Sequence, residues 1–289
     1  MQMVAASSAL LGDEGLARME AGIAVLEGWG LEVEHTQLHG RQWGYLAGKD
    51  LERRGDLEAT AKLLVCVRGG WGAARLLEAP LALPARWLLG FSDVTSLLWA
   101  QMAQGHGGAI HGPLLTTLAT EPAWSQERLR CLLFGDSLGD LQGEGWCGGI
   151  AAGPLLAANL TVATHLLGTP YLPDLRGAIL VLEDVGEAPY RIDRMLTHWR
   201  LCGALQQLAG IGLGQFTDCD DSPAEANRFS LEQVLRERTT DLGIPVVSNL
   251  PVGHVAGNAA LPLGTWAELD GSSGKLRINL AKQAPPLPR

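Results

Sequence analysis

Three polar side chains stand where apolar segments of the chain end. Ser92 follows the run WLLGF, Glu183 follows ILVL, and His254 lies in the loop after IPVVSN. Ligands of open α/β folds bind beyond the carboxyl ends of the strands, so we expect these side chains at a ligand site. A hydroxyl attacks only when a base accepts its proton, and an imidazole base needs a carboxylate to fix its tautomer. The chain order Ser, acid, His is that of strand-to-helix nucleophile elbows, and it predicts nucleophilic catalysis.

Ser92 also has a structural interpretation. A serine before an apolar helix is a favourable N-cap, worth about 1 kcal/mol. The elbow motif G-x-S-x-G is incomplete, because Val94 stands in place of the second glycine. Pattern alone therefore leaves both a capping serine and a nucleophile open.

The acid and the base have rivals of their own. Asp184 and Glu187 follow the same apolar run as Glu183 and compete with it as the acid. His254 could bond only to backbone, and His111 in the segment IHGP is a rival base. Each of these residues remains an alternative at this point.

A second polar strand end carries the glycine-rich segment RGGWG, residues 68–72. Glycine tolerates positive φ, so the segment could be only a tight turn. Backbone N–H groups at a helix start can also stabilise a developing oxyanion, and Gly70 and Asp93 are the candidates. Arg68 could hold a substrate carboxylate or pair with a surface acid. Trp71, inside the glycine loop, is the aromatic residue expected to line a pocket.

The sequence offers little support for a metal, a phosphate site or an organic cofactor. It contains no H-E-x-x-H, no G-x-G-x-x-G and no P-loop ending, and its seven histidines lack ligand spacing. We therefore expect catalysis without a metal or cofactor.

The elements that would position these residues alternate between strands and helices. The pattern predicts strands near 3–7, 31–36, 63–70, 87–92, 177–187, 208–216 and 244–249. It predicts helices near 13–30, 50–61, 73–79, 93–102, 155–170, 191–205 and 230–243. A hairpin is expected within 264–280. Such alternation is typical of parallel sheets with crossover helices.

The alternation weakens between residues 118 and 149, where glycine and aspartate are dense. We place a domain boundary there and expect an α/β fold of two domains. Residues 1–141 would form a Rossmann-like parallel sheet with flanking helices that carries the nucleophile. Residues 142–289 would form a second α/β domain that carries the acid and the base. The active site would then lie in the groove between the two domains.

Composition limits the partners and the compartment. The 289 residues are 47% hydrophobic and 18% charged, with a formal net charge of -9, which disfavours nucleic acid and anionic membranes as partners. Five scattered cysteines without a C-x-x-C favour a reducing compartment. The first residues have no basic n-region, and no apolar run approaches the roughly 20 residues of a membrane helix. We expect a cytoplasmic protein.

Several long segments resemble one known family. They include YLAGKDLERRGDLEA, VRGGWGAARLL, LLGFSDVTSLL, IHGP, LVLEDVGEAPYRIDRMLTHWR and PVVSNLPVGHVAGN. In this order they resemble the LD-carboxypeptidases, serine peptidases that include muramoyltetrapeptide carboxypeptidases and microcin C immunity proteins. The start MVAASS and the short segment before residue 63 depart from relatives. Both departures concern the sheet edge and a possible dimer surface.

The resemblance implies roles for individual residues. It places the nucleophile at Ser92, the acid at Glu183, the base at His254 and the oxyanion hole at the backbone of Gly70 and Asp93. It also implies a homodimer, and a substrate that is a murein-derived peptide from which a terminal D-alanine is removed in cell-wall recycling.

Two other functions remain open. An immunity-type hydrolase would cut an aminoacyl-nucleotide amide and would need an aromatic platform, for which Trp124 and Trp146 are candidates. A binding protein for cell-wall fragments would need no catalytic groups, so a complete triad argues against it.

Overall fold

The computed structural model describes residues 1–34, 36–220 and 229–280. The chain divides into two compact units. Among the described residues, the first comprises Met1–Ser137 and Ala256–Leu263, and the second comprises Leu138–Val255 and residues 264–280. The sequence placed a single crossing after residue 141. The structure has its first crossing after Ser137, and the chain also returns to the first unit for a short segment after Val255.

The first unit is built on a five-stranded sheet in the order β1-β2-β3-β4-β11. The first four strands are parallel, and β11 is antiparallel to β4. The strands are β1 Gln2–Val4, β2 Leu63–Cys66, β3 Trp87–Gly90, β4 Ala109–His111 and β11 Leu261–Pro262. Every residue of β2 and β3 is buried, as parallel strands covered on both faces require.

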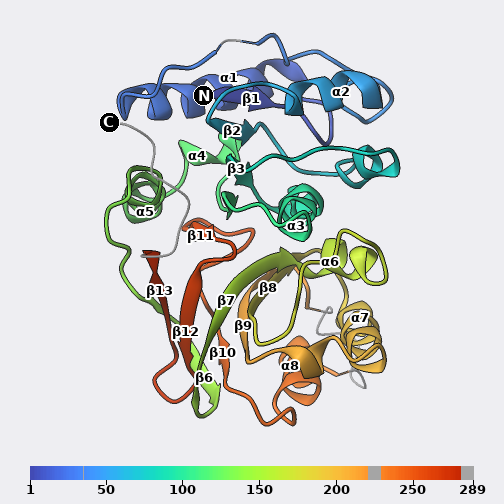
Figure 1. Ribbon diagram of the computed structural model, residues 1–289, viewed down its shortest axis with the longest axis vertical. Helices are drawn as coiled ribbons and strands as arrows, with labels where there is room; N and C mark the ends of the chain where they lie inside the picture. Colours follow the sequence, from blue (N-terminus) through green and yellow to red (C-terminus); the bar gives the residue numbers. More distant parts are fainter. Residues whose placement is uncertain (35, 221–228, 281–289) are drawn as a thin grey trace. The chain divides into compact units, whose positions relative to one another are not determined.

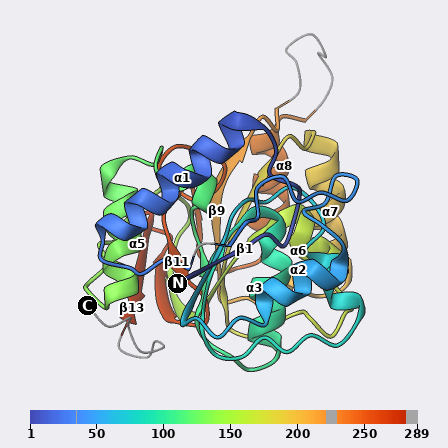
Figure 2. The same ribbon diagram turned by 90° about the horizontal axis from the view of Figure 1, so that it is seen from above.

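Helices cover both sides of this sheet. They are α1 Gly12–Gly28, α2 Asp50–Leu57, η1 Ala74–Glu78, η2 Ser92–Val94, α3 Thr95–Ala103, α4 Leu115–Leu118 and α5 Ala123–Phe134. Within this unit, Figure 2 shows α1 on one side of β1, with α2 and α3 on the other. Helix α1 packs closely on α4, because a Cβ at Gly22 would lie 2.0 Å from the Leu115 carbonyl oxygen.

The second unit contains an eight-stranded sheet in the order β5-β13-β12-β7-β8-β9-β10-β6. Strands β7 to β10 are parallel, and the outer strands are antiparallel to their neighbours. The strands are β5 Leu141–Gln142, β6 Glu144–Cys147, β7 Ile150–Asn159, β8 Ile179–Val185, β9 Gly210–Thr217, β10 Val246–Ser248, β12 Trp266–Asp270 and β13 Lys275–Asn279. Only Gly143 separates the two edge strands β5 and β6, so the sheet must curl until these two edges come close to each other.

Helices of the second unit pack beside the parallel part of its sheet (Figure 1). They are α6 Leu160–Leu166, α7 Pro189–Leu201, η3 Leu205–Gln207 and α8 Leu231–Thr239. Helix α8 begins with a capping box, in which the Ser230 hydroxyl accepts from the Gln233 N–H and the Gln233 side chain accepts from Ser230 N–H. The predicted α/β fold of two domains is confirmed. The sheet of each unit is mixed, because β11 in the first unit and the outer strands in the second are antiparallel to their neighbours.

Three local expectations are corrected by the structure. Residues 31–34 and 36 form no strand, and Glu34 makes only an isolated bridge to Gln2 because β1 offers just three residues; residue 35 lies outside the described residues. The expected helix 155–170 begins as the end of β7, and α6 starts only at Leu160, where the Asn159 side chain caps it. The expected helix 73–79 is a short 3₁₀ turn, η1.

Candidate active site

Ser92 lies at the sharp joint between β3 and η2 in the first unit. Its φ is +61°, a left-handed conformation that a serine rarely adopts. A non-glycine residue in this region costs about 1–2 kcal/mol, so the surrounding structure must enforce it. Strained residues of this kind concentrate at functional sites, and a strand-to-helix turn that presents a serine has the geometry of a nucleophile elbow.

The structure does not support Ser92 as a helix cap. Phe91 occupies the N-cap position of η2 and Val94 that of α3. Val94 also explains the incomplete motif, because it packs onto Gly90, where a Cβ would lie 2.8 Å from Val94 Cγ1. The valine therefore fills the space over the first glycine of the elbow.

The glycine loop after β2 lies directly against the elbow. A Cβ on Gly69 would be 3.2 Å from Ser92 Cβ, 3.3 Å from Ser92 Oγ and 3.7 Å from the Asp93 nitrogen. Gly70 and Gly72 have φ of +112° and +122°, which only glycine adopts without strain. The loop can approach Ser92 closely because Gly69 carries no side chain, whereas a Cβ on Gly70 would meet Ser8 and a Cβ on Gly72 would meet Leu46.

The Asp93 side chain holds the glycine loop in place. Asp93 is buried, and its Oδ2 accepts a hydrogen bond of 2.8 Å from Ala73 N–H. Burial raises the pKa of this carboxyl, while backbone hydrogen bonds from the loop oppose that shift. On the other side of the loop the buried Arg53 guanidinium donates to the Gly72 carbonyl at 2.8 Å and pairs with Asp50. One carboxylate and one guanidinium thus fix the loop by its backbone.

Two backbone N–H groups at this joint are available to a ligand. Among the described residues, neither Gly70 N–H nor Asp93 N–H donates a hydrogen bond. Asp93 is 1% exposed, so its amide is shielded from bulk water. Unsatisfied donors beside a serine are what stabilisation of an oxyanion requires.

Arg68 and Trp71 flank the same glycines. The Arg68 guanidinium donates from Nη1 to the Ala9 carbonyl at 3.0 Å, and it forms no ion pair with a described carboxylate. Trp71 is exposed, and its backbone N–H donates to Ser8 Oγ at 3.0 Å. Within the described residues, Arg68 therefore does not pair with a surface acid. The side chain of Trp71 is exposed and that of Arg68 is partly exposed.

Glu183 and His254 meet in the second unit. Glu183 lies in β8, two residues before its end, and is fully buried, and its Oε2 lies 2.7 Å from His254 Nδ1. Burial raises the pKa of Glu183, and the bond to His254 opposes that shift. The contact orients the imidazole so that Nε2 is directed away from the carboxylate, as a general base requires.

Glycines make room for this pair. A Cβ on Gly253, whose φ is +126°, would lie 3.0 Å from Glu183 Oε2. A Cβ on Gly214 would lie 3.2 Å from Glu183 Cβ and 2.4 Å from the Val252 carbonyl oxygen. The G-H motif thus needs its glycine because the backbone closes directly over the carboxylate.

The rival residues have other roles in the structure. Asp184 accepts from Asn159 Nδ2 at 3.0 Å and from Thr161 N–H at 2.9 Å, which anchors the first turn of α6. Glu187 pairs with Arg191 at 3.3 Å. Of these three acids at the end of β8, only Glu183 contacts His254 among the described residues.

His111 is fully buried in β4 of the first unit. Its ring packs edge-on against Phe91, with the ring centres 5.7 Å apart. An imidazole held within the core in this way is a packing residue, so the geometry favours His254 as the base.

The glycine loop brings in residues that the sequence reasoning missed. Gly69 is the glycine nearest Ser92, and Arg53 and the Asp93 side chain hold the loop. The sequence RGGWG shows both glycines. Only the structure shows that Gly69 borders Ser92 and that Gly70 has the positive φ. Nothing in the segment DLERR indicated that Arg53 would reach a carbonyl nineteen residues away.

The described residues contain no cluster of possible metal ligands. Within residues 1–34, 36–220 and 229–280, no three His, Cys, Asp or Glu side chains gather as a metal ion would need. The five cysteines are free, and Cys66 and Cys219 are buried.

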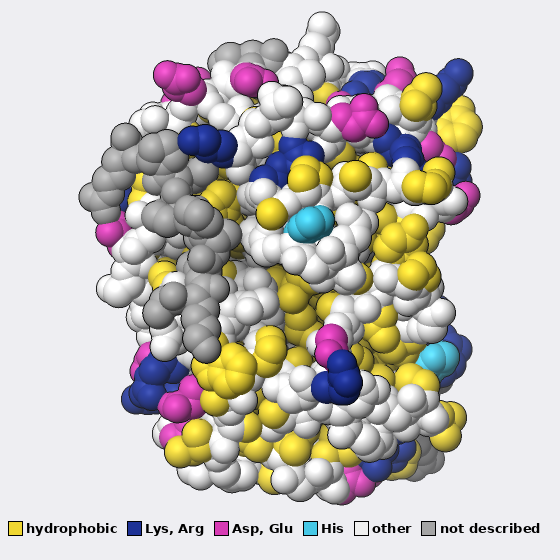
Figure 3. All heavy atoms as spheres, viewed as in Figure 1, with side chains coloured by type: hydrophobic (Ala, Val, Ile, Leu, Met, Phe, Trp, Pro, Cys, Tyr) yellow, Lys and Arg dark blue, Asp and Glu magenta, His cyan; other side chains and the backbone are white. Residues whose placement is uncertain are grey.

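Within residues 1–34, 36–220 and 229–280, none of the helices has the length and the apolar character of a bilayer-spanning segment. On the face shown in Figure 3, acidic and basic side chains are interspersed.

Comparison with known proteins matches both halves of the chain to one family. Residues 1–112 match the LD-carboxypeptidase N-terminal domain, and residues 152–269 match the LD-carboxypeptidase C-terminal domain. The chain belongs to the LD-carboxypeptidase family. The assignment agrees with the resemblance seen in the sequence motifs.

Relatives and solved structures extend this assignment. A Synechocystis sp. protein named as a carboxypeptidase is 49% identical over 90% of this chain and 89% of its own. The murein tetrapeptide carboxypeptidase of Pseudomonas aeruginosa is 35% identical over 93% of this chain and 92% of its own. The muramoyltetrapeptide carboxypeptidase of Oxalobacter formigenes has 28% identity and a TM-score of 0.83, covering 96% of this chain and 98% of its own. The microcin C7 self-immunity protein MccF shares the fold. Its TM-score is 0.84 at 20% identity, and the match covers 98% of this chain and 96% of MccF.

Proposed function

We propose that this protein is a serine-type LD-carboxypeptidase that removes the terminal D-alanine from murein tetrapeptides, with Ser92, Glu183 and His254 as its catalytic triad. The observation that carries the proposal is the buried Glu183 carboxylate 2.7 Å from His254 Nδ1. The strained conformation of Ser92 supports the nucleophile, and the Pseudomonas aeruginosa relative supplies the substrate class. In this proposal the nucleophile comes from the first unit, and the acid and the base come from the second.

In the first half-reaction Ser92 Oγ attacks the carbonyl carbon that precedes the terminal residue. His254 Nε2 accepts the hydroxyl proton, and Glu183 stabilises the imidazolium that forms. The backbone N–H groups of Gly70 and Asp93 hold the oxyanion. His254 then returns the proton to the leaving nitrogen, the C–N bond breaks, and D-alanine departs from an acyl-enzyme.

In the second half-reaction a water molecule attacks the ester carbonyl. His254 takes a proton from the water, the same two N–H groups hold the second oxyanion, and the proton passes to Ser92 Oγ as the ester bond breaks. Arg68 binds the terminal carboxylate of the substrate, and Trp71 lines the pocket around it. No step needs a metal or an organic cofactor.

The proposal is tested by D-alanine release from a murein tetrapeptide. We expect turnover by the wild-type protein and none by Ser92→Ala, with Ser273→Ala as a control at an exposed turn outside the proposed site. A wild-type protein that binds the peptide without releasing D-alanine would instead support the binding protein for cell-wall fragments.

An aminoacyl-sulfamoyl adenylate in the same assay tests the immunity-type alternative. That activity needs an aromatic platform for the nucleobase, and both candidates already have partners. The Arg236 guanidinium lies 4.0 Å from the Trp146 ring centre, and Trp124 packs on Gly257, where a Cβ would lie 2.5 Å from its ring. We therefore expect the murein peptide to be cleaved faster than the adenylate.

We also propose that the protein acts in the cytoplasm and that it forms a homodimer, as the family resemblance implies. Light scattering on the purified chain tests the dimer, and fractionation of cells that express the chain tests the compartment.

A further inference from the structure

The backbone that follows His254 is bound by a buried carboxylate. Glu121 directly precedes Pro122, the N-cap of α5, and it is 8% exposed. Its Oε2 accepts hydrogen bonds from Gly257 N–H at 2.7 Å and from Asn258 N–H at 3.0 Å. The carboxylate and both amides belong to the first unit.

Helix α5 adds two further hydrogen bonds to the same segment. The Ser125 hydroxyl donates to the Asn258 carbonyl at 2.8 Å, and Arg128 Nε donates to the Ala260 carbonyl at 3.0 Å. Both side chains are buried. The start of α5 and the glutamate before it thus hold this segment by four bonds to its backbone.

The Glu121 carboxylate is a costly means of holding a backbone segment. It forms no ion pair with any residue that the structure describes. Burial raises the pKa of this carboxyl, and the hydrogen bonds from the two N–H groups oppose that shift. A buried charge without a cation lowers stability unless its hydrogen bonds compensate. Hydrogen bonds to an ionised acceptor are shorter and stronger than neutral ones, so the carboxylate holds the segment more rigidly than a neutral group would.

The connection between this anchor and His254 is short. Only Val255 and Ala256 separate His254 from Gly257. Three residue steps span at most about 11 Å. Val255 N–H also donates to the Gly253 carbonyl at 2.9 Å, which folds the chain back within the connection. A shift of Gly257 is therefore passed to the imidazole with little slack to absorb it.

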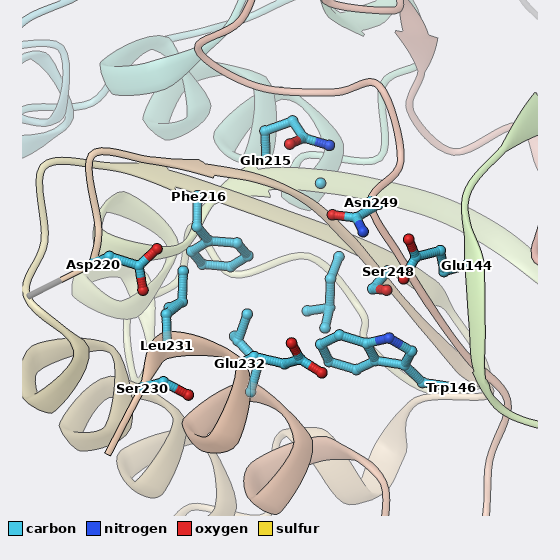
Figure 4. A pocket seen from close by; sticks show the side chains of 13 residues that line it. Glu144, Trp146, Gln215, Phe216, Asp220, Ser230, Leu231, Glu232, Ser248 and Asn249 are labelled. Carbon is cyan, nitrogen blue, oxygen red and sulfur yellow. The ribbon is translucent and has the colours of Figure 1, made fainter. Parts of the chain in front are cut away.

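The chain up to His254 is anchored separately, on β9 of the second unit. Gln215 N–H donates to the Val252 carbonyl at 2.8 Å, and Gln215 Nε2 donates to the Leu250 carbonyl at 3.1 Å. Figure 4 shows Gln215 at the edge of the cavity that this residue lines. The Thr217 hydroxyl donates to the His254 carbonyl at 3.0 Å. The loop thus has a fixed point on each side of the histidine.

We propose that Glu121 is a positioning residue for catalysis: by fixing residues 257 and 258, it keeps the His254 imidazole on the Glu183 carboxylate, 2.7 Å away, in the orientation of a general base. Glu121 acts through the backbone and takes no part in proton transfer. A loop that is free at this end lets the imidazole leave the productive geometry, and a misplacement of about 1 Å costs roughly 100-fold in rate. The inference rests on the proposed function, because it adds a residue outside the triad to the same reaction.

Phosphonylation of Ser92 by a fluorophosphonate tests the inference without a peptide substrate, because its rate depends on the base. In Glu121→Ala we expect the second-order rate constant to fall roughly 10-fold to 100-fold, while mass spectrometry still finds one adduct on every molecule. A merely structural role would lower the fraction of protein that is labelled and leave the rate constant unchanged. Glu121→Gln, whose amide oxygen accepts from the same two N–H groups, should stay within about threefold of the wild-type rate constant.

Glu127→Ala is the matched control. It removes another carboxylate of α5, one that is exposed and pairs with Arg130 at 2.6 Å, and it should label at the wild-type rate. Release of D-alanine from a murein tetrapeptide should rank the variants in the same order, through kcat, with KM within about twofold of wild type.

Urea unfolding reports whether Glu121→Ala folds. Where it does not, Ser125→Ala replaces it, because this change removes only the bond to the Asn258 carbonyl. Loss of one hydrogen bond should lower the labelling rate constant by roughly threefold to tenfold.

A wild-type rate constant in the folded variant would overturn the inference and leave the triad intact. Labelling that slows in Glu121→Ala, without release of D-alanine by the wild-type protein, would support the inference and count against the murein substrate instead. Absence of labelling at Ser92 in the wild-type protein would overturn the triad and the inference together.

Discussion

Ser92 and Glu183 both stand at the carboxyl end of a parallel strand, yet the two units hold them by different means. Ser92 is half-buried and is presented by backbone strain, with φ of +61° and a glycine loop packed against it. Glu183 has ordinary strand backbone and is held by burial and by one short contact to His254. Ser92 lowers the stability of the fold through its backbone conformation, and Glu183 lowers it through the burial of its charge.

The comparison teaches that each residue should respond to a different perturbation. Relief of strain at Ser92 should change stability independently of pH. Loss of charge at Glu183 should change stability in a way that depends on pH. Both changes should abolish activity, because the chemistry needs the hydroxyl and the carboxylate together.

The largest effect is expected at the nucleophile. Ser92→Ala removes the attacking oxygen and should lower kcat by roughly 10⁴-fold to 10⁶-fold. Alanine keeps the same backbone strain, so we expect the free energy of unfolding to change by less than about 1 kcal/mol. D-alanine release and urea unfolding measure the two quantities. Retained activity together with a large loss of stability would restore the capping interpretation.

The next effect is expected at the buried acid. Glu183→Gln keeps the shape but no longer holds the imidazole in the productive tautomer, so kcat should fall by roughly 10⁴-fold. Asp184→Asn is the matched control: it alters the neighbouring buried carboxylate, which anchors α6 and does not contact His254. We expect that variant to lose stability while it retains kcat within about tenfold.

The stability of Glu183→Gln relative to wild type should depend on pH, which tests whether the Glu183 carboxyl is buried. Burial raises the folded-state pKa of Glu183 above its ordinary value of 4.5. A group with a raised pKa stabilises the fold fully below its unfolded pKa and loses that contribution as pH rises through the folded pKa. The free energy of unfolding of the variant, relative to wild type, should therefore increase as pH rises from about 4.5. A difference that falls with pH would contradict the burial of an ionising carboxyl.

A smaller effect is expected in the glycine loop. Gly69→Ala places a Cβ 3.2 Å from Ser92 Cβ and displaces the elbow by a few tenths of an ångström, so kcat should fall roughly 10-fold to 100-fold. Gly107→Ala is the control, because a Cβ there meets nothing within 4 Å. Equal kcat values for the two variants would show that the loop does not position Ser92.

The smallest effect separates strain from chemistry. Ser92→Gly and Ser92→Ala both lack the hydroxyl, but only glycine adopts φ of +61° without strain. We expect Ser92→Gly to be more stable than Ser92→Ala by about 1 kcal/mol in urea unfolding. Equal stabilities would mean that the joint stores no strain.

The sequence predicted the positions of Ser92 and Glu183 at strand ends better than it predicted the elements and contacts around them. The apolar runs before Ser92 and Glu183 identified both strand ends, since buried parallel strands read as continuous hydrophobic segments. The helix expected at 155–170 was wrong in its first part, because LLAAN fits a buried strand as well as a buried helix. The choice of Glu183 over Asp184 depended on which carboxylate faces His254, and that alternation is set by register and the bulge in β8 rather than by residue type.

Labelling of Ser92 by a fluorophosphonate tests most directly whether the elbow and the Glu183–His254 pair act as one site, and it requires no knowledge of the substrate. We predict that mass spectrometry of the intact wild-type protein finds one adduct on Ser92, and that His254→Ala and Glu183→Gln each slow its formation at least about a hundredfold, because the base activates the hydroxyl. Labelling of Ser92 at the wild-type rate in His254→Ala, or no labelling of Ser92 in the wild-type protein, would contradict the account.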